Sequence, residues 1–354
     1  MVTDEFRAAA ARIEANPLGR LMYGQRELFH SNLLAWFFDS LPEAADRAFG
    51  EYATPGVGNE RQVERERGHL DLVMRWPDRL PLVIENKVFS LPQAAQLDEY
   101  RQATAKWNPA PSLVLLSTTE PSFDLGEWKH VSYAELAERI RASLPTNASY
   151  EVETMRRYAD LVGDLHQLVA AVRVKRDDEP IWLGEDVLSA ISSSQMRAAL
   201  QKSRAQRVAD VVAKALPGPD GPKASMSNAT PLVELFQYAF LGGVHAHFGW
   251  QLQGNQFRRA VVYHDAAIKG RDEASRRARE ELSRQHPEFF TLPTAISATR
   301  SGRKEFNHFA PNFVYQYAKV GGLTVGEWGV TLFVDGRYQE GTAGRDVYES
   351  QEVH

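Results

Sequence analysis

The chain has 354 residues, of which 43% are hydrophobic and 25% charged, a composition typical of a globular protein with room for two domains. It contains no cysteine, so disulfide scaffolds, thiolate zinc sites and iron–sulfur clusters are excluded. Its net charge is -5, from 41 Lys and Arg against 46 Asp and Glu, so any contact with nucleic acid must be local or assisted by cations.

Nothing in the sequence indicates a membrane or secreted protein. No apolar run approaches the roughly 18 residues that a membrane-spanning helix needs. The N-terminal sequence MVTDEFRAAAARIEANP has acidic residues and lacks the basic-then-apolar order of a secretory signal. We therefore expect a cytoplasmic location and no membrane partner.

The first fifty residues are expected to be helical. Residues 4–15 are rich in alanine, and Pro17-Leu18-Gly19 is expected to end that helix. Residues 27–41 place leucine and aromatic side chains at helical spacing, and Pro42 ends or bends the second helix.

From residue 59 the periodicity changes to that of strands. Residues 60–66 alternate, and 70–76 and 81–88 are β-prone runs separated by a turn at Pro77-Asp78. A polar helix over 92–104 is followed by strands at 112–117 and 129–132 and by helices at 133–144 and 150–174. This order predicts a mixed α/β core.

The remainder is expected to form a second domain. Residues 181–216 are expected to be mostly helical, and residues 217–228, with three prolines and two glycines, are the best linker candidate. The predicted domains are thus 1–216 and 229–354, the latter an α+β region. Its expected elements are helices at 231–241 and 266–285 and strands at 250–253, 259–264, 313–319 and 328–335.

Three charged side chains stand at the ends of the two β-prone runs. Residues two apart on a strand face the same side, so Glu85 and Lys87 project together, while Asn86 points away and offers its backbone carbonyl. Asp71 on the neighbouring strand can meet Glu85, and Gly68 allows close backbone approach just before it. The alternative is a solvated strand face, since Glu-x-Lys is common by chance. The buried run before Glu85 favours a site, because sites form at strand ends in α/β sheets.

The oxygen donors at these strand ends are suited to a hard cation. Two carboxylates and a carbonyl, completed by water and phosphate, would bind Mg²⁺ or Mn²⁺. The metal would lower the pKa of a bound water and offset charge on a phosphate, and Lys87 would hold that water. The pattern therefore indicates a metal-dependent phosphodiesterase.

The motifs Gly68-x-x-Asp71, Glu85-x-Lys87 and Gln96-x-x-x-Tyr100 resemble the PD-(D/E)XK nuclease superfamily, in particular its RecB-like branch and the bacterial group with Glu-Asn-Lys and Gln-Leu-x-x-Tyr. Leu70 stands where the naming proline would be. The resemblance covers roughly residues 20 to 175 and implies a restriction-endonuclease-like mixed sheet flanked by helices.

The resemblance also implies roles for individual residues. Asp71 and Glu85 would be metal ligands, Lys87 the catalytic lysine, and Gln96 and Tyr100 contacts to the nucleic-acid strand near the scissile phosphate. Glu27, on a helix ahead of the sheet, would be a further metal ligand, direct or through water.

The expected function is that of a Mg²⁺-dependent nuclease acting on DNA, with a role in prokaryotic antiviral defence, restriction or repair. The alternatives are a nuclease for RNA or branched DNA, and a catalytically silent module that binds nucleic acid or protein. A homodimer is attractive for cutting both strands, and the C-terminal region would serve recognition, oligomerisation or regulation by a protein partner.

Other residues have two interpretations each. His30 and His69 would assist the metal or phosphate site, or simply pack; His245 and His247 would bind metal only with further ligands, which the spacing does not supply. Two sets of cations are expected to be solvated helix faces, with a nucleic-acid groove as the alternative: Lys202, Arg204 and Arg207, and Arg276, Arg277 and Arg279. An aromatic cluster is expected to pack in the core, with base stacking as the alternative: Phe306, His308, Phe309, Phe313, Tyr315 and Tyr317.

Overall fold

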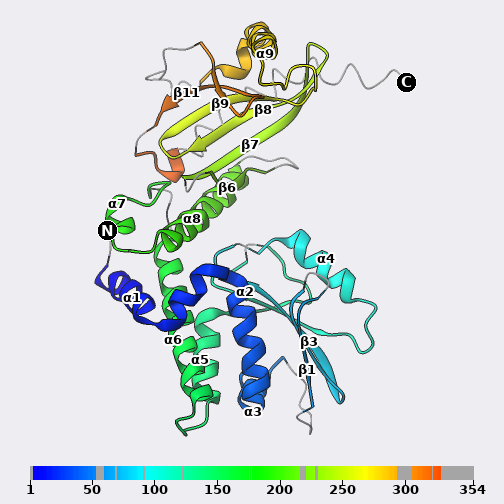
Figure 1. Ribbon diagram of the computed structural model, residues 1–354, viewed down its shortest axis with the longest axis vertical. Coiled ribbons are helices and arrows are strands. Elements are labelled where there is room, and N and C mark those ends of the chain that lie inside the picture. Colours follow the sequence, from blue (N-terminus) through cyan, green and yellow to red (C-terminus); the bar gives the residue numbers. More distant parts are fainter. Residues whose placement is uncertain are drawn as a thin grey trace. The chain divides into compact units, whose positions relative to one another are not determined.

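A computed structural model describes residues 3–52, 60–67, 70–90, 92–121, 123–174, 176, 178–215, 221–227, 230–292, 305–320 and 322–327. The chain divides into two compact units (Figure 1). The first comprises residues 1–173 and 185–203, and the second 174–184 and 204–354. No helix of the described residues is both long and apolar enough to cross a membrane.

The first unit contains a five-stranded sheet and its helices. The helices of its main body are α1 (Asp4–Ala15), α2 (Pro17–Ser40), α3 (Pro42–Ala48), α4 (Ala94–Thr104), α5 (Tyr133–Ser143) and α6 (Tyr150–Ala171). The strands are β1 (Gln62–Arg67), β2 (Leu70–Trp76), β3 (Arg79–Lys87), β4 (Ser112–Ser117) and β5 (Lys129–Ser132). A short helix α7 (Glu185–Leu188) follows, and α8 (Ser194–Ala215) contributes residues to both units.

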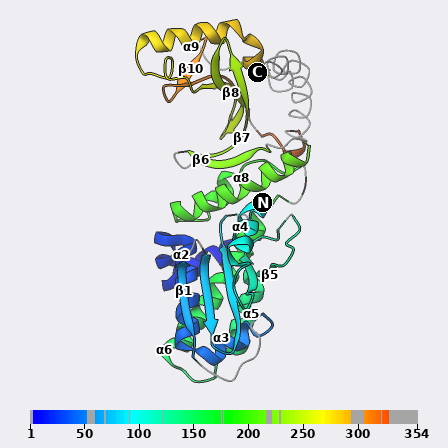
Figure 2. The ribbon, with the colours of Figure 1, turned by 90° about the vertical axis from the view of Figure 1, so that its right-hand side faces the viewer.

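The five strands lie side by side in chain order (Figure 2). The pairs β1–β2 and β2–β3 are antiparallel, whereas β3–β4 and β4–β5 are parallel. Figure 1 shows α2, α5 and α6 along one side of the sheet and α4 along the other. The predicted mixed sheet flanked by helices is therefore confirmed.

Burial of both faces explains the composition of β3. From Pro81 to Asn86 every residue of this strand is buried, as in a strand covered by helices on both sides. On the α4 side, Val83 packs with Val73, Leu97 and Tyr100. The indole N–H of Trp128 donates to the Leu97 carbonyl at 3.2 Å and ties α4 to the segment before β5.

Helix α2 begins earlier than expected. Asn16 accepts a hydrogen bond from the Leu18 N–H at 3.0 Å and caps the helix, with Pro17 at its first position. Proline is favoured there because its fixed φ suits a helix start and its missing N–H costs nothing. The prediction that Pro17-Leu18-Gly19 ends the first helix holds, since α1 stops at Ala15, but the same residues also start the second.

The second unit is built on a six-stranded antiparallel sheet. Its spatial order is β10-β11-β9-β8-β7-β6. The strands are β6 (Lys223–Ser227), β7 (Thr230–Leu241), β8 (Val244–Gln253), β9 (Gln256–Tyr263), β10 (Asn307–Phe309) and β11 (Phe313–Lys319). Helix α9 (Glu273–Gln285) and the 3-10 helix η1 (Pro287–Phe290) complete the α+β arrangement.

Only one face of this second sheet carries the hydrophobic core. At one end Val208 and Val212 of α8 pack on Val233, Trp250 and further strand residues. At the other end Phe248 and Tyr263 pack with η1 and with residues near α9. Because side chains alternate along a strand, the residues between these core positions project to the opposite face.

Two expectations for this region are wrong. Residues 231–241 are part of β7 instead of a helix, because this segment pairs along its length with β8 and, near its start, with β6. Residues 223–227, expected within a linker, form the edge strand β6. The remaining linker residues 217–220 and 228, together with Gly68, His69 and the expected strand at 328–335, lie outside the described residues.

Candidate functional site

The predicted site lies where β2 and β3 separate. The antiparallel register of the two strands runs as far as Leu72 opposite Ile84. Beyond that pair, the Asp71 carboxylate accepts a hydrogen bond from the Asn86 backbone N–H at 2.8 Å. The Asp71 carboxylate thus replaces the backbone carbonyl that would otherwise accept this hydrogen bond from β3. Asp71 is thereby held next to Glu85, on the face that α4 covers.

Glu85 and Lys87 form a buried ion pair. The Lys87 Nζ atom lies 2.6 Å from Glu85 Oε1, and the Glu85 side chain is 1% exposed. The second oxygen of Glu85, Oε2, is buried without a hydrogen-bond partner. Buried polar atoms nearly always have a partner, so this oxygen is available to a group that the fold itself does not supply.

The charges of the site perturb one another. Burial, and then the negative charge of Asp71, raises the pKa of Glu85 to about 8, although Lys87 opposes the shift. Burial also raises the pKa of Asp71. Burial alone would lower the pKa of Lys87, but Glu85, Asp71 and Glu27 together raise it above its usual value. The lysine therefore stays charged, and the two neighbouring carboxyl groups resist being ionised together.

Glu27 approaches the same site from α2. Its carboxylate accepts hydrogen bonds from the backbone N–H and the hydroxyl of Ser90, just after β3. Its backbone carbonyl accepts from the Asn86 side-chain amide at 2.9 Å. Glu27 acts on the pKa of Asp71, Glu85 and Lys87, which places its charge within electrostatic reach of all three. Sequence reasoning missed Ser90, for which no local pattern exists.

The Asn86 side chain points away from the site and into a buried polar network. Its oxygen accepts a hydrogen bond from the Tyr133 hydroxyl, and its amide also lies 3.4 Å from the Ser31 hydroxyl. Tyr133 in turn hydrogen-bonds with Tyr158 of α6. Asn86 therefore joins β3 to α2 and α5, which positions the strand end that carries Glu85 and Lys87.

His30 belongs to this network and not to the acidic site. Its Nδ1 atom lies 3.2 Å from the Tyr158 hydroxyl, and the ring is fully buried. Burial lowers the pKa of His30 to about 3, so the ring is neutral and cannot bind phosphate as a cation. The structure favours the packing interpretation.

Gln96 and Tyr100 lie on one side of α4. The Gln96 amide donates to the Tyr100 hydroxyl at 2.7 Å, as expected for residues four apart on a helix. Burial, and then the charge of Glu85, raises the pKa of Tyr100. Because Lys87 and Asp71 act on this pKa as well, the hydroxyl lies within electrostatic reach of the strand ends. With Gln96 as donor, Tyr100 keeps its own hydrogen for another acceptor.

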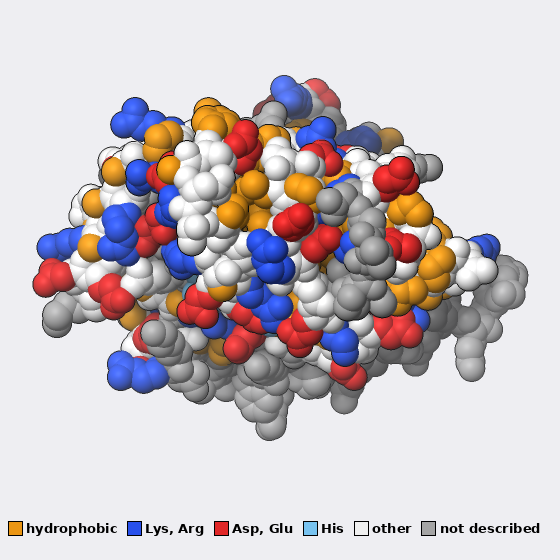
Figure 3. Space-filling model, turned by 90° about the horizontal axis from the view of Figure 1, so that it is seen from below, with side chains coloured by type: hydrophobic (Ala, Val, Ile, Leu, Met, Phe, Trp, Pro, Cys, Tyr) orange, Lys and Arg blue, Asp and Glu red, His pale blue; other side chains and the backbone are white. Residues whose placement is uncertain are grey.

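Several of the cationic helix residues are engaged in contacts within the chain. Arg204 is buried and donates to the Ile181 carbonyl at 3.1 Å. On α9, Arg276 and Arg277 are ion-paired with Glu273. The face of the molecule seen in Figure 3 shows Lys and Arg interspersed with Asp and Glu. Charge of mixed sign on that face offers a polyanion little general attraction.

The donor chemistry of the strand ends fits a hard divalent cation. Asp71, Glu85 and Glu27 supply only oxygen, the Asn86 carbonyl lies beside them in sequence, and Glu85 Oε2 lacks a partner. Among the residues that the structure describes, however, no three Asp, Glu or His side chains are grouped closely enough to hold a metal ion. A bound ion would therefore have to draw the carboxylates together.

Comparisons with known proteins give a family match for part of the first unit. No curated protein and no solved structure gives a significant match. A family model described as the PD-(D/E)XK nuclease superfamily matches residues 18–160, a segment that contains Glu27, Asp71, Glu85 and Lys87. Residues 18–160 of the first unit are therefore similar to the PD-(D/E)XK nuclease superfamily.

Proposed function

We propose that the chain is a divalent-metal-dependent nuclease that hydrolyses phosphodiester bonds in DNA. The observation that carries the proposal is the buried contact of Lys87 with Glu85, beside Asp71, at the separating ends of two strands. Buried charges of this kind are costly unless a function retains them. Buried carboxylate oxygens usually have a partner, so the lone Glu85 Oε2 atom supports the presence of a bound group.

The acidic groups of the site would hold the cation. Asp71, Glu85 and the Asn86 carbonyl are the proposed ligands, with Glu27 bound directly or through water. When bound, a divalent ion, Mg²⁺ or Mn²⁺, lowers the pKa of a water molecule and offsets the charge of the phosphate. Nucleases of this superfamily generally use divalent metal ions.

Lys87 would act on the water and the phosphate. Its ammonium group, kept charged by the surrounding carboxylates, can donate a hydrogen bond to the attacking water or to a phosphate oxygen. The water oxygen attacks phosphorus, and the bond to the leaving oxygen breaks, so that a phosphate monoester and a hydroxyl remain. Tyr100 and Gln96 would bind the strand next to the cleaved bond.

Two finer points belong to the same proposal. A homodimer with one site per chain would cut both strands of a duplex, so the active form is expected to sediment as a dimer on DNA. A stable monomer on cleaved duplex would contradict this. The chemistry of the site suits a role in prokaryotic defence, restriction or repair, where cleavage of DNA is the required reaction.

Cleavage assays test the proposal directly. Linear DNA, circular DNA and RNA are each incubated with the protein in Mg²⁺, Mn²⁺ or EDTA, alongside Lys87→Ala and Asp71→Ala. Metal-dependent cleavage of DNA that both substitutions abolish supports the proposal. Cleavage that persists in either variant contradicts the assignment of the site. Cleavage of RNA alone contradicts the proposal that DNA is the substrate.

Matched variants control for folding. Lys129 is an exposed lysine on β5, and Asp160 is a half-exposed aspartate paired with Arg141. Lys129→Ala and Asp160→Ala should cut DNA at the rate of the unmodified protein. Equal circular dichroism and thermal unfolding across the set would show that lost cleavage is not lost fold.

A further inference from the structure

The second sheet has one face that the described helices do not cover, here called the open face. Register places Phe236 of β7, Gly249 of β8, Ala260 of β9 and Tyr315 of β11 in one row across it. The neighbouring row contains Tyr238, His247, Val262 and Phe313. The middle of the open face is therefore recessed, since Gly249 and Ala260 lie between larger aromatic side chains.

Aromatic rings on the open face form a continuous series, here called the aromatic row. It consists of Phe236, Phe309, Phe313, Tyr315 and Tyr317. Ring centroids are 5.9 Å apart for Phe236 and Phe313 and 6.2 Å apart for Phe309 and Phe313. The series continues at 5.7 Å from Phe313 to Tyr315 and at 6.1 Å from Tyr315 to Tyr317.

The structure divides the aromatic cluster that the sequence suggested. Phe306 is buried among the core residues near α9, as expected for packing. Phe309, by contrast, is 53% exposed at the sheet edge. Tyr238 and Phe240, also on the open face, are 55% and 59% exposed. Large exposed rings gathered on one surface usually mark a binding site, because rings left in water contribute little burial free energy to the fold.

Polar groups beside the aromatic row can form hydrogen bonds with the edges of planar rings and with phosphate groups of a ligand. The Arg258 guanidinium stacks 4.9 Å from the Tyr315 ring centre and donates to Gln251 at 2.8 Å. His247 and His264 lie next to Phe313 and hydrogen-bond each other at 2.6 Å. These groups supply hydrogen-bond donors and acceptors on the open face.

The charge of the open face is locally positive although the chain is acidic overall. Its described strands direct three cations outward, Lys223, Arg258 and Lys319. Glu234 is the one carboxylate that they place there, and it accepts a hydrogen bond from Gln251 at 2.8 Å. A polyanion is the complementary ligand for such a surface.

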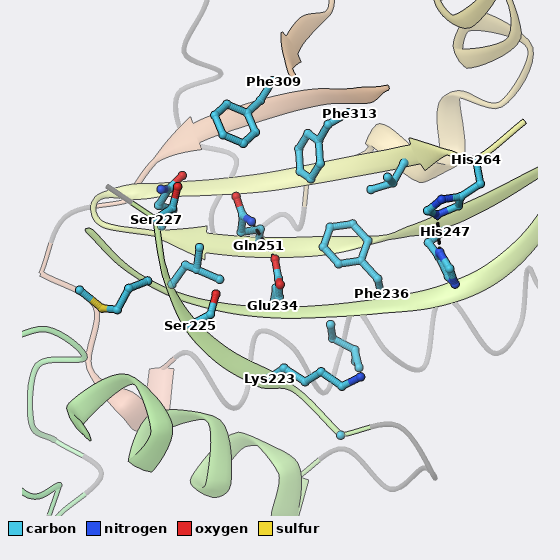
Figure 4. Close-up of a pocket in the computed structure, with 16 residues that line it drawn as sticks. Lys223, Ser225, Ser227, Glu234, Phe236, His247, Gln251, His264, Phe309 and Phe313 are labelled. Atoms are coloured by element: carbon cyan, nitrogen blue, oxygen red, sulfur yellow. Dashed lines mark hydrogen bonds between the residues drawn. The ribbon is translucent and has the colours of Figure 1, made fainter. Parts of the chain in front are cut away.

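A groove runs along this face (Figure 4). It has a volume of about 510 Å³, and its lining includes Phe236, Phe309, Phe313, His247 and Lys223. Figure 4 shows Phe309 and Phe313 on one side of the groove and Lys223 on the other, with Gln251 and Glu234 between them. The groove thus offers rings to bases along one wall and a cation along the other.

We propose that the open face binds single-stranded nucleic acid, with unpaired bases stacked on the aromatic row and phosphates near Lys223, Arg258 and Lys319. Every base has an apolar ring face, so aromatic side chains bind single strands with little regard to sequence. Duplex DNA hides those ring faces and is not expected to bind here. The inference extends the proposed nuclease function, since it gives the nucleic acid a second position on the chain.

Binding to a cleavage-silent protein tests the inference apart from catalysis. The full chain carrying Lys87→Ala is titrated, in EDTA, into fluorescein-labelled single-stranded DNA, single-stranded RNA and duplex DNA of about 20 nucleotides. Phe309→Ala and Tyr315→Leu, each added to that chain, should weaken single-strand binding about tenfold, within the range for one base–aromatic contact. Arg258→Gln should reduce the slope of log affinity against log salt by about 0.7, the loss of one phosphate contact.

An exposed aromatic residue outside the open face supplies the control. Tyr150 in the first unit is 77% exposed, and Tyr150→Leu should leave single-strand affinity unchanged.

The DNA and RNA titrations show which kind of strand is bound, and binding of either supports the inference. Unchanged affinity in both ring variants would overturn it, as would equal weakening for duplex DNA. If those variants instead abolish a dimer seen by sedimentation and leave oligonucleotide binding intact, the open face is a self-association surface and the inference fails. A wild-type protein that binds but does not cut would contradict only the proposed function.

Discussion

The two sheets of this protein use their faces in opposite ways. The first sheet is covered on both sides, and its central strand β3 is buried from Pro81 to Asn86. The charged residues of β3 stand only near its two ends. Among the described residues, the hydrophobic core of the second sheet lies on one face, and aromatic and charged side chains occur on the other.

This difference separates two kinds of surface. Burial at the end of β3 perturbs the pKa of Glu85 and fixes Lys87 in place, as an active site requires. The open face instead leaves rings such as Phe309, Tyr238 and Phe240 exposed, so they stay available to a ligand. Chemistry is therefore expected at the first sheet and contact with a ligand at the second.

The strongest test of this contrast compares two phenylalanines of the second sheet. Phe257 is fully buried on the covered face, whereas Phe240 is 59% exposed on the open face. Phe257→Ala should lower the free energy of unfolding by about 3–5 kcal/mol through lost burial and a residual cavity. Phe240→Ala should change it by less than about 0.5 kcal/mol. Urea denaturation followed by circular dichroism measures both, and similar losses would show that the open face is covered in solution.

A second test addresses the end of β3. Lys87→Gln keeps a polar side chain but removes the charge that faces Glu85. The rate of DNA cleavage should fall about 10²–10³-fold, the usual effect of removing one group that stabilises a transition state. Single-turnover rates at saturating DNA give this number. A drop confined to DNA affinity, with the rate at saturation intact, would mean that Lys87 only binds substrate.

A third test uses the pH dependence of stability without metal. The folded protein keeps a proton on Glu85 up to its raised pKa of about 8, whereas the unfolded chain loses that proton near the ordinary glutamate pKa of 4.5. The contribution of Glu85 to stability should therefore be fully present below about pH 4.5 and should be lost as pH rises towards 8. The slope from this one group is at most about 1.4 kcal/mol per pH unit.

Urea denaturation in EDTA across this pH range measures that slope. Glu85→Gln should flatten it, while Glu153→Gln, at a half-exposed glutamate paired with Arg156, should not. A Glu85→Gln slope equal to that of the unmodified protein would show that the acidic strand end does not carry the titration.

The smallest expected effect concerns the network behind β3. Tyr133→Phe removes the hydroxyl that donates to the Asn86 side chain and leaves a buried oxygen without its partner. The free energy of unfolding should fall by about 1–3 kcal/mol. Tyr52→Phe, at a partly exposed tyrosine that hydrogen-bonds with Arg139, should cost less than about 0.5 kcal/mol. Thermal and urea unfolding compare the two, and equal costs would contradict a special role for Tyr133.

Parts of the site followed from sequence because they depend on short-range geometry. Glu85 and Lys87 share a face since the strand period is two, and the turn at Pro77-Asp78 brings Asp71 opposite them. Ser90, Tyr133 and Tyr158 could not be found in this way. Their contacts with Glu27 and Asn86 join segments far apart in sequence, and no local pattern encodes such packing.

The errors in the fold have the same origin. Residues 231–241 carry apolar side chains at spacings that suit a helix or a strand, and only pairing with β6 and β8 decides between them. The start of α2 was a different case. Asn16 before Pro17 is typical of a helix start, whereas Pro17 taken by itself predicts only the end of the preceding helix.

The side chain of Asn86 also has a consequence for the order of events during synthesis. Residues 27–31, which hold this asparagine on one side, leave the ribosome early, but Tyr133 follows 47 residues after it. A growing chain can contain Asp71, Glu85 and Lys87 well before the hydroxyl that orients their strand has been made. Contacts across such sequence distances form only when the unit folds as a whole. The proposed cleavage activity would then arise only on completion of the first unit.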